Sequence, residues 1–221
     1  MATPLRIDFV SDVACPWCVI GLRSLMKALD AVGDKVDVAI HFQPFELNPD
    51  MAPEGENTTE HVIKKYGSNP ERSAASRNAM KESGDALGFT FNYGPQSRIW
   101  NTFDAHRLLH WAGVEGKQLE LKEALFKANF TDQLSTSDHE VLVGAAKAAG
   151  LDERRARQVL ASGEFTDDVR RDEMLWRNRG ISAVPSVIFN QRWMVQGGQP
   201  PQVFEQAIRQ IVSGNAEEAR A

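Results

Sequence analysis

The sequence contains very few cysteines. Only Cys15 and Cys18 occur in 221 residues, which excludes a small secreted fold held together by several disulfides. Long apolar runs are also missing, since no stretch approaches the roughly 18 consecutive apolar residues that a membrane-spanning helix needs. Positive charge is not in excess either, because the formal net charge is −5. We therefore expect neither a nucleic-acid nor a membrane partner.

The amino terminus shows no sign of a secretory signal. Residues 1–6 lead directly into a strand-like stretch, without a basic start, an apolar run and a small-residue cleavage site. We therefore expect a cytoplasmic protein. In that setting, two cysteines three positions apart indicate either redox chemistry or half of a metal site.

Two strands and one helix are predicted before residue 45. Residues 6–10 alternate β-forming apolar and polar side chains, which is typical of a strand. Apolar residues then recur at helical spacing from Trp17 to Leu29, and Gly33 marks the end of that helix. Residues 36–42 alternate again. Because a crossover helix is the usual link between parallel strands, this order indicates a βαβ unit.

The long middle of the chain is predicted to be helical. Between residues 58 and 180 the pattern favours helices over 59–66, 70–87, 102–112, 119–129, 138–149, 152–161 and 166–179. Ser137 and Glu140 indicate a capping box for the helix that starts near residue 138.

Strands return only near the end of the chain. Residues 186–189 and 193–195 indicate a hairpin, and Pro200-Pro201 opens a last helix that runs to about Ile211. Residues 215–221 are polar, and we expect them to be frayed.

The two cysteines form the motif Cys15-Pro16-Trp17-Cys18, where the first strand gives way to the first helix. At a helix amino terminus, the Cys15 sulfur faces unpaired backbone N–H groups and the positive end of the helix dipole, which favour the thiolate. Cys18 follows one turn later on the same side, close enough for a short disulfide. Pro16 suits the first helical position, where a missing N–H costs nothing. Thiol–disulfide exchange needs such an attacking thiolate and a second thiol that resolves the mixed disulfide.

Two other interpretations of the cysteines stay open at this point. Cysteines in a helix are often only small buried hydrophobic residues, although the spacing and the proline disfavour this reading. A zinc site would need further ligands, and His106 and His110, four residues apart, are the candidates for a Cys₂His₂ set. Apolar residues surround both histidines, which fits packing or a pocket wall better, so we expect no metal.

Four segments resemble a known family: residues 11–18, 42–49, 101–107 and 180–186. With the C-P-W-C motif at a helix start and a proline before the hairpin, the chain resembles the thioredoxin-fold oxidoreductases of the DsbA-like family. It is most similar to their cytosolic FrnE-type branch, which is related to 2-hydroxychromene-2-carboxylate isomerases. The resemblance implies an α/β, thioredoxin-like fold (βαβ … ββα) with a large all-helical insertion between its halves. Residues 1–57 and 175–221 would form the thioredoxin-like domain, and residues 58–174 the helical insertion domain.

The resemblance also implies a second half of the site. In that family the proline before the hairpin is cis and lies against the C-x-x-C. Val184–Pro185 should therefore be a cis bond, with Pro185 beside the Cys15 sulfur and the Val184 backbone able to pair with an extended substrate. A trans proline that merely starts a strand is the alternative. Pro16 and Trp17, between the cysteines, are expected to support the site by tuning its redox poise.

Other residues receive roles from the same resemblance. Thioredoxin-like proteins often keep a buried acid beneath the resolving cysteine as a proton relay, and Asp8 is the candidate. Asp12 is expected instead to cap the turn or the helix. In the related isomerases the segment around residue 101 helps to wall the substrate cavity. This makes Asn101, Thr102 and His106 substrate-binding candidates, with packing as the alternative.

The chain is therefore predicted to be a cytoplasmic thiol–disulfide oxidoreductase or isomerase, with Cys15 as nucleophile and Cys18 as resolving thiol. Its partner would be a disulfide- or thiol-bearing protein or a small thiol. No cofactor is expected beyond the Cys15–Cys18 disulfide, with glutathione as a candidate co-substrate. The alternative is a glutathione-dependent isomerase or transferase of a small aromatic molecule, which would not need Cys18. A non-enzymatic binding module is disfavoured by the intact motif, and the sequence indicates no oligomeric state.

Overall fold

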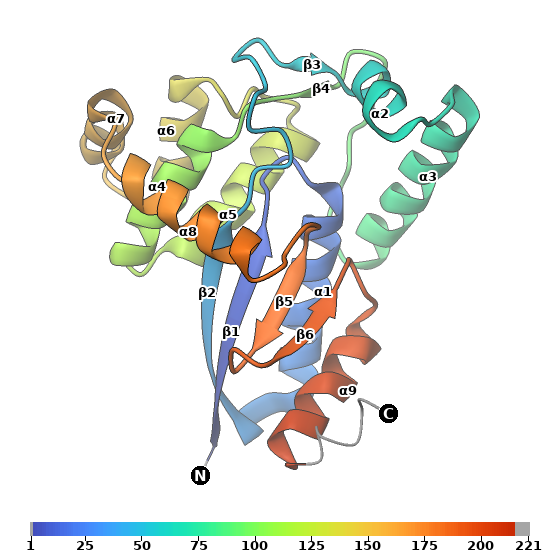
Figure 1. The fold of residues 1–221 in the computed structure, drawn as a ribbon, viewed down its shortest axis with the longest axis vertical. Coiled ribbons are helices and arrows are strands. Elements are labelled where there is room, and N and C mark those ends of the chain that lie inside the picture. Colours follow the sequence, from blue (N-terminus) through green and yellow to red (C-terminus); the bar gives the residue numbers. More distant parts are fainter. Residues whose placement is uncertain (1, 215–221) are drawn as a thin grey trace.

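A four-stranded mixed sheet forms the centre of the computed structural model, which describes residues 2–214 (Figure 1). Strand β1 (Thr3–Ser11) is parallel to β2 (Val36–Pro44) and antiparallel to β5 (Ser186–Phe189), which pairs with β6 (Trp193–Gln196). The strand order is β2-β1-β5-β6. The predicted parallel βαβ unit and the predicted hairpin are both confirmed.

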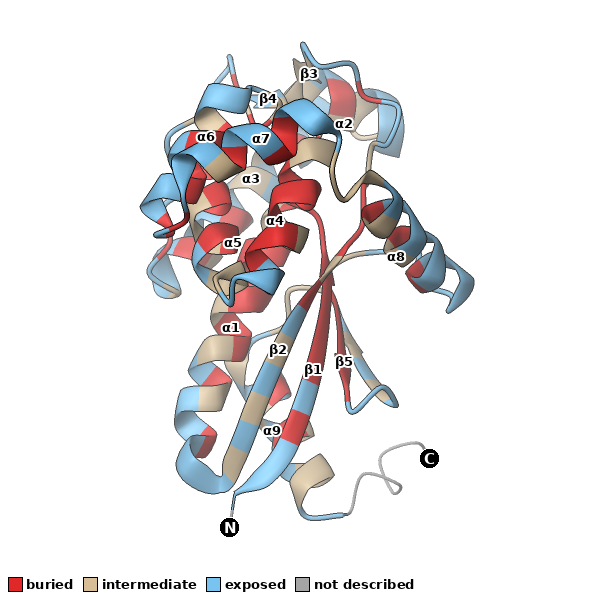
Figure 2. Ribbon diagram, turned by 90° about the vertical axis from the view of Figure 1, so that its left-hand side faces the viewer, coloured by how far each residue is buried: buried red, intermediate tan, exposed pale blue. Residues whose placement is uncertain are grey.

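Two helices cover one face of this sheet. Helix α1 (Pro16–Val32) packs against α9 (Pro201–Val212), and both lie on the same side of the strands in Figure 1. Because side chains alternate along a strand, β1 sends Ile7 and Phe9 into the core that it shares with α1 and α9. Figure 2 shows that β1 is buried over most of its length, while the first part of edge strand β2 alternates between exposed and half-buried residues.

The opposite face of the sheet is covered over its upper part. Val10 of β1 and Ile188 of β5 pack there against Trp176 of α8 (Thr166–Asn178), next to Phe45, which follows β2. The carboxyl ends of β1 and β2 are therefore buried from both sides. The loop that leaves β1 toward Cys15 consequently starts inside the protein.

The remaining helices lie above the sheet in two groups (Figure 1). Helices α4 to α8 stand on one side and α2 and α3 on the other, with these bounds: α2 (Thr58–Tyr66), α3 (Pro70–Ala86), α4 (Phe103–Val114), α5 (Gln118–Phe126), α6 (His139–Ala148) and α7 (Glu153–Ser162). A second apolar core, with Leu108, Leu121, Leu142 and Val159 among its members, holds α4 to α7 together. The predicted helices of this region are thus all present, with small shifts at their ends.

Three local features differ from expectation. The structure contains a two-stranded pair, β3 (Glu56–Asn57) and β4 (Arg98–Ile99), which is too short to leave a periodic pattern. The helix predicted to reach residue 129 instead ends as α5 at Phe126 and continues as a π-helical turn, η2 (Lys127–Thr131). A 3₁₀ turn, η1 (Gly33–Lys35), links α1 to β2.

The predicted capping box of α6 is wrong. Asp138, not Ser137, is the N-cap, and its carboxylate accepts a hydrogen bond from the backbone N–H of Glu140 at 2.7 Å. The Ser137 hydroxyl donates instead to the carbonyl oxygen of Asn101 at 2.9 Å. An aspartate at the next position competes better for the free N–H groups, because its charge also favours the helix dipole.

Within residues 2–214, no helix is long and apolar enough to cross a membrane. The expected fraying of residues 215–221 lies outside the described residues. The division of the chain at residues 57/58 and 174/175 into two domains stays a prediction.

Candidate active site

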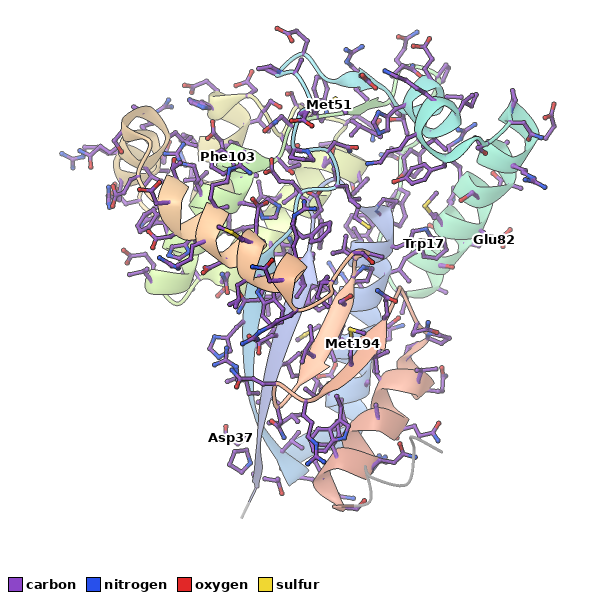
Figure 3. The ribbon with its side chains drawn as sticks, viewed as in Figure 1. Trp17, Asp37, Met51, Glu82, Phe103 and Met194 are labelled. Carbon is purple, nitrogen blue, oxygen red and sulfur yellow. The ribbon has the colours of Figure 1, made fainter. Side chains whose placement is uncertain are left out.

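The C-x-x-C motif occupies the amino-terminal end of α1. Cys15 is the N-cap residue with an extended backbone, and Pro16 takes the first helical position. The first turn contains no acidic side chain, so nothing there opposes the attraction of the free N–H groups and the helix dipole for a thiolate. Trp17 is 39% exposed and stands at this end of α1 on the side that faces α3 (Figure 3). The sequence-based placement of the motif is thus confirmed.

The two thiols differ in access. Both are free, Cys15 is 3% exposed and Cys18 is completely buried. Burial raises the pKa of Cys18 well above its usual value, and the neighbouring Cys15 sulfur raises it further. Cys18 therefore holds its proton more tightly than an exposed thiol does.

The Val184–Pro185 peptide bond is cis, as predicted. The Cys15 thiol donates to the carbonyl oxygen of Val184, with the sulfur and oxygen 3.6 Å apart. Glycine allows Pro185 to approach α1, because a Cβ atom at Gly21 would lie 2.9 Å from Cγ of the proline ring. The two halves of the candidate site, which are far apart in sequence, are therefore in contact.

Asp12 holds the loop between β1 and Cys15 from below. One carboxylate oxygen accepts from the N–H of Ala14 at 3.1 Å and from the hydroxyl of Thr102 at 2.8 Å, and the other accepts from the N–H of Leu47 at 2.7 Å. Nε2 of His106 lies 3.5 Å from the first oxygen. Burial alone would raise the pKa of Asp12, but the nearby His106 and these N–H groups outweigh it and lower the pKa. Asp12 is therefore a buried, ionised carboxylate that fixes the loop before Cys15 through its hydrogen bonds, in keeping with the predicted role as a cap of the turn.

The structure places the three substrate-binding candidates behind this loop. Thr102 and His106 contact Asp12, and the Asn101 side chain donates to the carbonyl oxygen of Met51 at 2.9 Å. None of the three lines the pocket around Cys15 described below. Their contacts show a structural role, and their role in substrate binding stays a prediction.

Asp8 is not brought to Cys18. It shares its face of β1 with Val10, the face opposite α1, because side chains two positions apart point the same way. There its carboxylate accepts hydrogen bonds from Arg6 at 2.7 Å and from Gln43 at 2.8 Å. The carboxylate of Asp8 is therefore engaged on the face of the sheet opposite α1.

His106 and His110 do not assemble a metal site with the cysteines. His106 faces Asp12, whereas His110 lies 3.8 Å from a carboxylate oxygen of Asp172 and beside the ring of Phe165. Among the described residues there is no group of three or more histidine, cysteine, aspartate or glutamate side chains placed to hold a metal ion.

Cys15 lies in a pocket of about 580 Å³ between the end of α1, the Val184 segment and helices α2 and α3. Its wall contains three arginines, Arg72, Arg77 and Arg98, and no aspartate or glutamate. None of the three arginines forms an ion pair with another residue of the described chain. In a protein of net charge −5, this pocket is a local region of positive charge.

Tyr93 and His61 add polar groups to the same wall. Tyr93 lines the pocket together with Cys15, and its burial raises the pKa of the phenol. His61 is nine-tenths buried, its Nδ1 lies 2.6 Å from a carboxylate oxygen of Glu56, and its Nε2 has no hydrogen-bond partner among the described residues. The pocket thus offers several hydrogen-bonding groups to a bound molecule.

Sequence analysis did not find these pocket residues. Arg72 and Arg77 occupy α3, whose weakly amphipathic sequence gives no sign of which face meets Cys15. A buried lysine, Lys122 of α5, was also missed, although its charge acts on Cys18. Only the three-dimensional packing of the helices on the loop identifies them.

A family comparison now decides the class of protein. The model of the DSBA-like thioredoxin domain family matches residues 6–209. The chain belongs to the DSBA-like thioredoxin domain family. This family includes oxidoreductases that act on thiols and disulfides. The predicted α/β thioredoxin-like fold is confirmed, and the FrnE-type branch stays a prediction.

Three known proteins illustrate the similarity. A probable DsbA oxidoreductase from Streptomyces coelicolor is 34% identical, with a TM-score of 0.89 over 95% of this chain and 90% of its own. The uncharacterised protein YwbO from Bacillus subtilis is 25% identical over 92% of this chain and 96% of its own. The cytosolic disulfide reductase DsbM from Pseudomonas aeruginosa, solved with GSH, is 15% identical, with a TM-score of 0.63 over 94% and 99% of the two chains. At that identity DsbM shows the shared DSBA-like fold alone.

Proposed function

We propose that this DSBA-like protein catalyses thiol–disulfide exchange, with Cys15 as the attacking and Cys18 as the resolving thiol. The observation that carries the proposal is the contrast between the two sulfurs. Cys15 lines a pocket at a helix amino terminus, whereas Cys18 is completely buried one turn behind it. A substrate therefore reaches only Cys15, and Cys18 can react only with a disulfide formed on Cys15.

The exchange proceeds in two balanced steps. The Cys15 thiolate attacks one sulfur of the substrate disulfide, forms a mixed disulfide and releases one substrate thiolate. Cys18 then loses its proton and attacks the Cys15 sulfur, which releases the second substrate thiolate and leaves a Cys15–Cys18 disulfide. The substrate gains two electrons and the protein loses two. The same steps in reverse oxidise a substrate dithiol.

The cytoplasm is the proposed compartment, where reduction or isomerisation is the favoured direction. No cofactor other than the cysteine pair is needed, and glutathione is the proposed small-thiol partner. The name of DsbM, a cytosolic disulfide reductase solved with GSH, supports the proposed compartment and the proposed glutathione partner. The direction of exchange is set by the redox potential of the pair relative to its partner.

Trapping with Cys18→Ala tests the proposal. The variant should hold one glutathione on Cys15 after exposure to glutathione disulfide, because the resolving thiol is gone. The wild-type protein should instead pass rapidly to the Cys15–Cys18 disulfide. Intact-protein mass spectrometry over time distinguishes the two outcomes. An adduct that Cys18→Ala loses as fast as wild type would contradict the assignment of Cys18.

The pocket supports a small anionic disulfide as substrate. Arg72, Arg77 and Arg98 supply positive charge without any carboxylate in the wall, and charged hydrogen bonds to a carboxylate are among the stronger ones. Glutathione disulfide carries several carboxylates and fits this pattern. The same pocket favours the second candidate, a glutathione-dependent isomerase or transferase of a small aromatic acid. Full turnover of such an acid by Cys18→Ala would select that candidate.

Arg77→Gln should raise the KM for glutathione disulfide about 10- to 150-fold, because one charge-assisted hydrogen bond contributes about 1.5–3 kcal/mol. The KM for the neutral bis(hydroxyethyl) disulfide should change little. Steady-state kinetics with both disulfides measures the difference. Arg154→Gln, an exposed arginine of α7 outside the pocket, is the matched control. An equal rise in KM for the charged and the neutral disulfide would show that the pocket does not select substrates by their charge.

A further inference from the structure

Strand β2 forms an open edge of the central sheet. It pairs with β1 and, within residues 2–214, with no other strand, and Figure 2 shows it on the outer side of β1 below α4 and α5. Its register with β1 runs without interruption from Val36 to Pro44, so no bulge turns the edge away. Residues 36–43 also contain no lysine or proline, the residues that often protect such edges. An edge of this kind is a template for pairing with another chain.

Gln118 of α5 binds this edge at one position as a neighbouring strand would. Its side-chain oxygen accepts from the N–H of Phe42 at 3.0 Å, and its side-chain nitrogen donates to the carbonyl oxygen of Phe42 at 3.2 Å. Phe42 therefore turns both of its backbone polar groups away from β1. Because this direction alternates along a strand, Val36, Val38 and Ile40 turn theirs the same way. Among the described residues, these three groups have no hydrogen-bond partner on that side.

A groove of about 1080 Å³ runs along the free edge. Apolar side chains of β2, α1 and α5 make up much of its lining: Met26, Leu29, Val36, Val38, Ile40 and Leu119. Val114 of α4, at the same groove, is 70% exposed, which is unusual for a large apolar side chain without a partner. The volume exceeds the roughly 300–1,000 Å³ of small-molecule sites. Among the described residues, none lines both this groove and the pocket of Cys15.

Carboxylates stand at both ends of the groove. Asp30 and Asp34 lie just before the start of β2, and Glu120 and Asp172 belong to α5 and α8 beside its far end. Asp30 and Asp34 form no ion pair within the described part of the chain, whereas Glu120 and Asp172 each pair with a basic residue outside the groove. Of the described lysines and arginines, only Lys122 lines the groove, and it is 1% exposed. The groove therefore favours an apolar ligand with positively charged ends.

We propose that β2 binds an extended, basic segment of a partner protein as a fifth strand of the sheet. The segment pairs through its backbone with Val36, Val38 and Ile40 and ends before Phe42, where Gln118 already holds the edge. Its apolar side chains cover the groove, and lysine or arginine at its ends faces the carboxylates. A second copy of this chain fits less well, because it brings the same carboxylates against the groove. The site is separate from Cys15, so this inference does not rest on the proposed function.

A synthetic peptide tests the surface directly. The probe is fluorescein-labelled Lys-Lys-Val-Thr-Ile-Thr-Val-Lys-Lys, which alternates apolar residues between basic ends. One control peptide has glutamate in place of every lysine, and a second has N-methyl groups on all central residues, which removes its backbone donors. Fluorescence anisotropy with the full chain at low salt gives the Kd of each. The basic peptide should bind with one-to-one stoichiometry, and both controls should bind at least about 10-fold more weakly.

Two variants of the chain alter the edge in different ways. Val38→Pro removes an N–H from the free edge, where proline is tolerated because that N–H bonds no other strand, and should raise the Kd of the basic peptide at least about 10-fold. Asp34→Lys leaves the strand unchanged and reverses one charge, and should raise the Kd about 5-fold. Glu82→Lys, at an exposed glutamate of α3 outside the groove (Figure 3), is the matched control and should bind like wild type. Thermal unfolding checks that each variant is folded.

Several results would overturn the inference. The basic peptide may fail to bind wild type, or the acidic or the N-methylated peptide may bind equally well. A folded Val38→Pro or Asp34→Lys protein that keeps the affinity of wild type would also contradict it. Sedimentation velocity distinguishes the remaining occupant, because a wild-type dimer that Val38→Pro dissociates would assign the edge to a second copy of the chain instead of a basic partner.

Discussion

Replacing Cys15 with serine is expected to lower the rate of disulfide exchange on the order of 10³-fold or more, as removal of a reacting nucleophile does in other enzymes. A serine hydroxyl does not ionise at the helix amino terminus, so no thiolate is available to attack. The substitution is nearly isosteric, and a hydroxyl can also make the hydrogen bond of the Cys15 side chain to the carbonyl oxygen of Val184. Folding should therefore be retained, and reduction of glutathione disulfide coupled to dithiothreitol measures the loss.

Cys18→Ser separates the two roles in the same assay. With dithiothreitol left out, the reduced variant mixed with glutathione disulfide should release one equivalent of glutathione, whereas wild type releases two, because Cys15 remains able to attack but Cys18 no longer resolves the mixed disulfide. If Cys15→Ser releases that first equivalent and Cys18→Ser does not, the order of the two cysteines is reversed. Circular dichroism of both variants serves as the control for folding.

Asp12→Ala is expected to reduce the free energy of unfolding by about 3–5 kcal/mol, the loss typical of breaking a buried charged network. The substitution leaves the N–H groups of Ala14 and Leu47 and the hydroxyl of Thr102 without their acceptor. Urea denaturation followed by circular dichroism gives the difference. Asp138→Ala removes an aspartate that accepts only one N–H at the exposed start of α6, and should cost about 1 kcal/mol.

The pH dependence of this loss follows from the direction of the pKa shift. Folding lowers the pKa of Asp12 below its ordinary 3.8. A carboxyl group of this kind contributes stability that is complete above its unfolded pKa and is lost as pH falls through its folded pKa. The difference between wild type and Asp12→Ala should therefore be constant above about pH 5 and shrink in acid. A difference that grows as the pH falls would contradict an ionised Asp12.

Much of the fold was predictable because its signals are local. The alternation in β1 and β2, the helical spacing after Cys15 and the hairpin before α9 each lie within a few consecutive residues. The shifts occur where local signals compete or run out. Two acceptors next to each other contend for the start of α6, and strands of two residues such as β3 carry no period.

The candidate site was predictable only where it follows the chain. The spacing of Cys15 and Cys18 was enough to predict the redox motif, and the resemblance to a family predicted the cis bond at Val184–Pro185. Asp12 acts through hydrogen bonds with residues 35 and 90 positions away, and Arg77 of α3 reaches the pocket of Cys15 only through the fold. No periodicity encodes which helix face meets which loop. The position of Asp8 shows the same limit, because alternation along β1 does not say which of its two faces meets the helix that carries the cysteines.

The loop before Cys15 is tied to several distant parts of the chain. Asp12 is bound by Leu47 just after β2 and by Thr102 at the start of α4, and Asn129 of η2 donates to the carbonyl oxygen of Val13 at 3.0 Å. The helices above the sheet therefore cannot be replaced without removing hydrogen bonds that hold the loop before Cys15. A C-P-W-C tetrapeptide grafted onto a thioredoxin scaffold without these helices would have the two thiols but not the hydrogen bonds that hold the loop before them. The reactive centre is a shared product of the whole polypeptide.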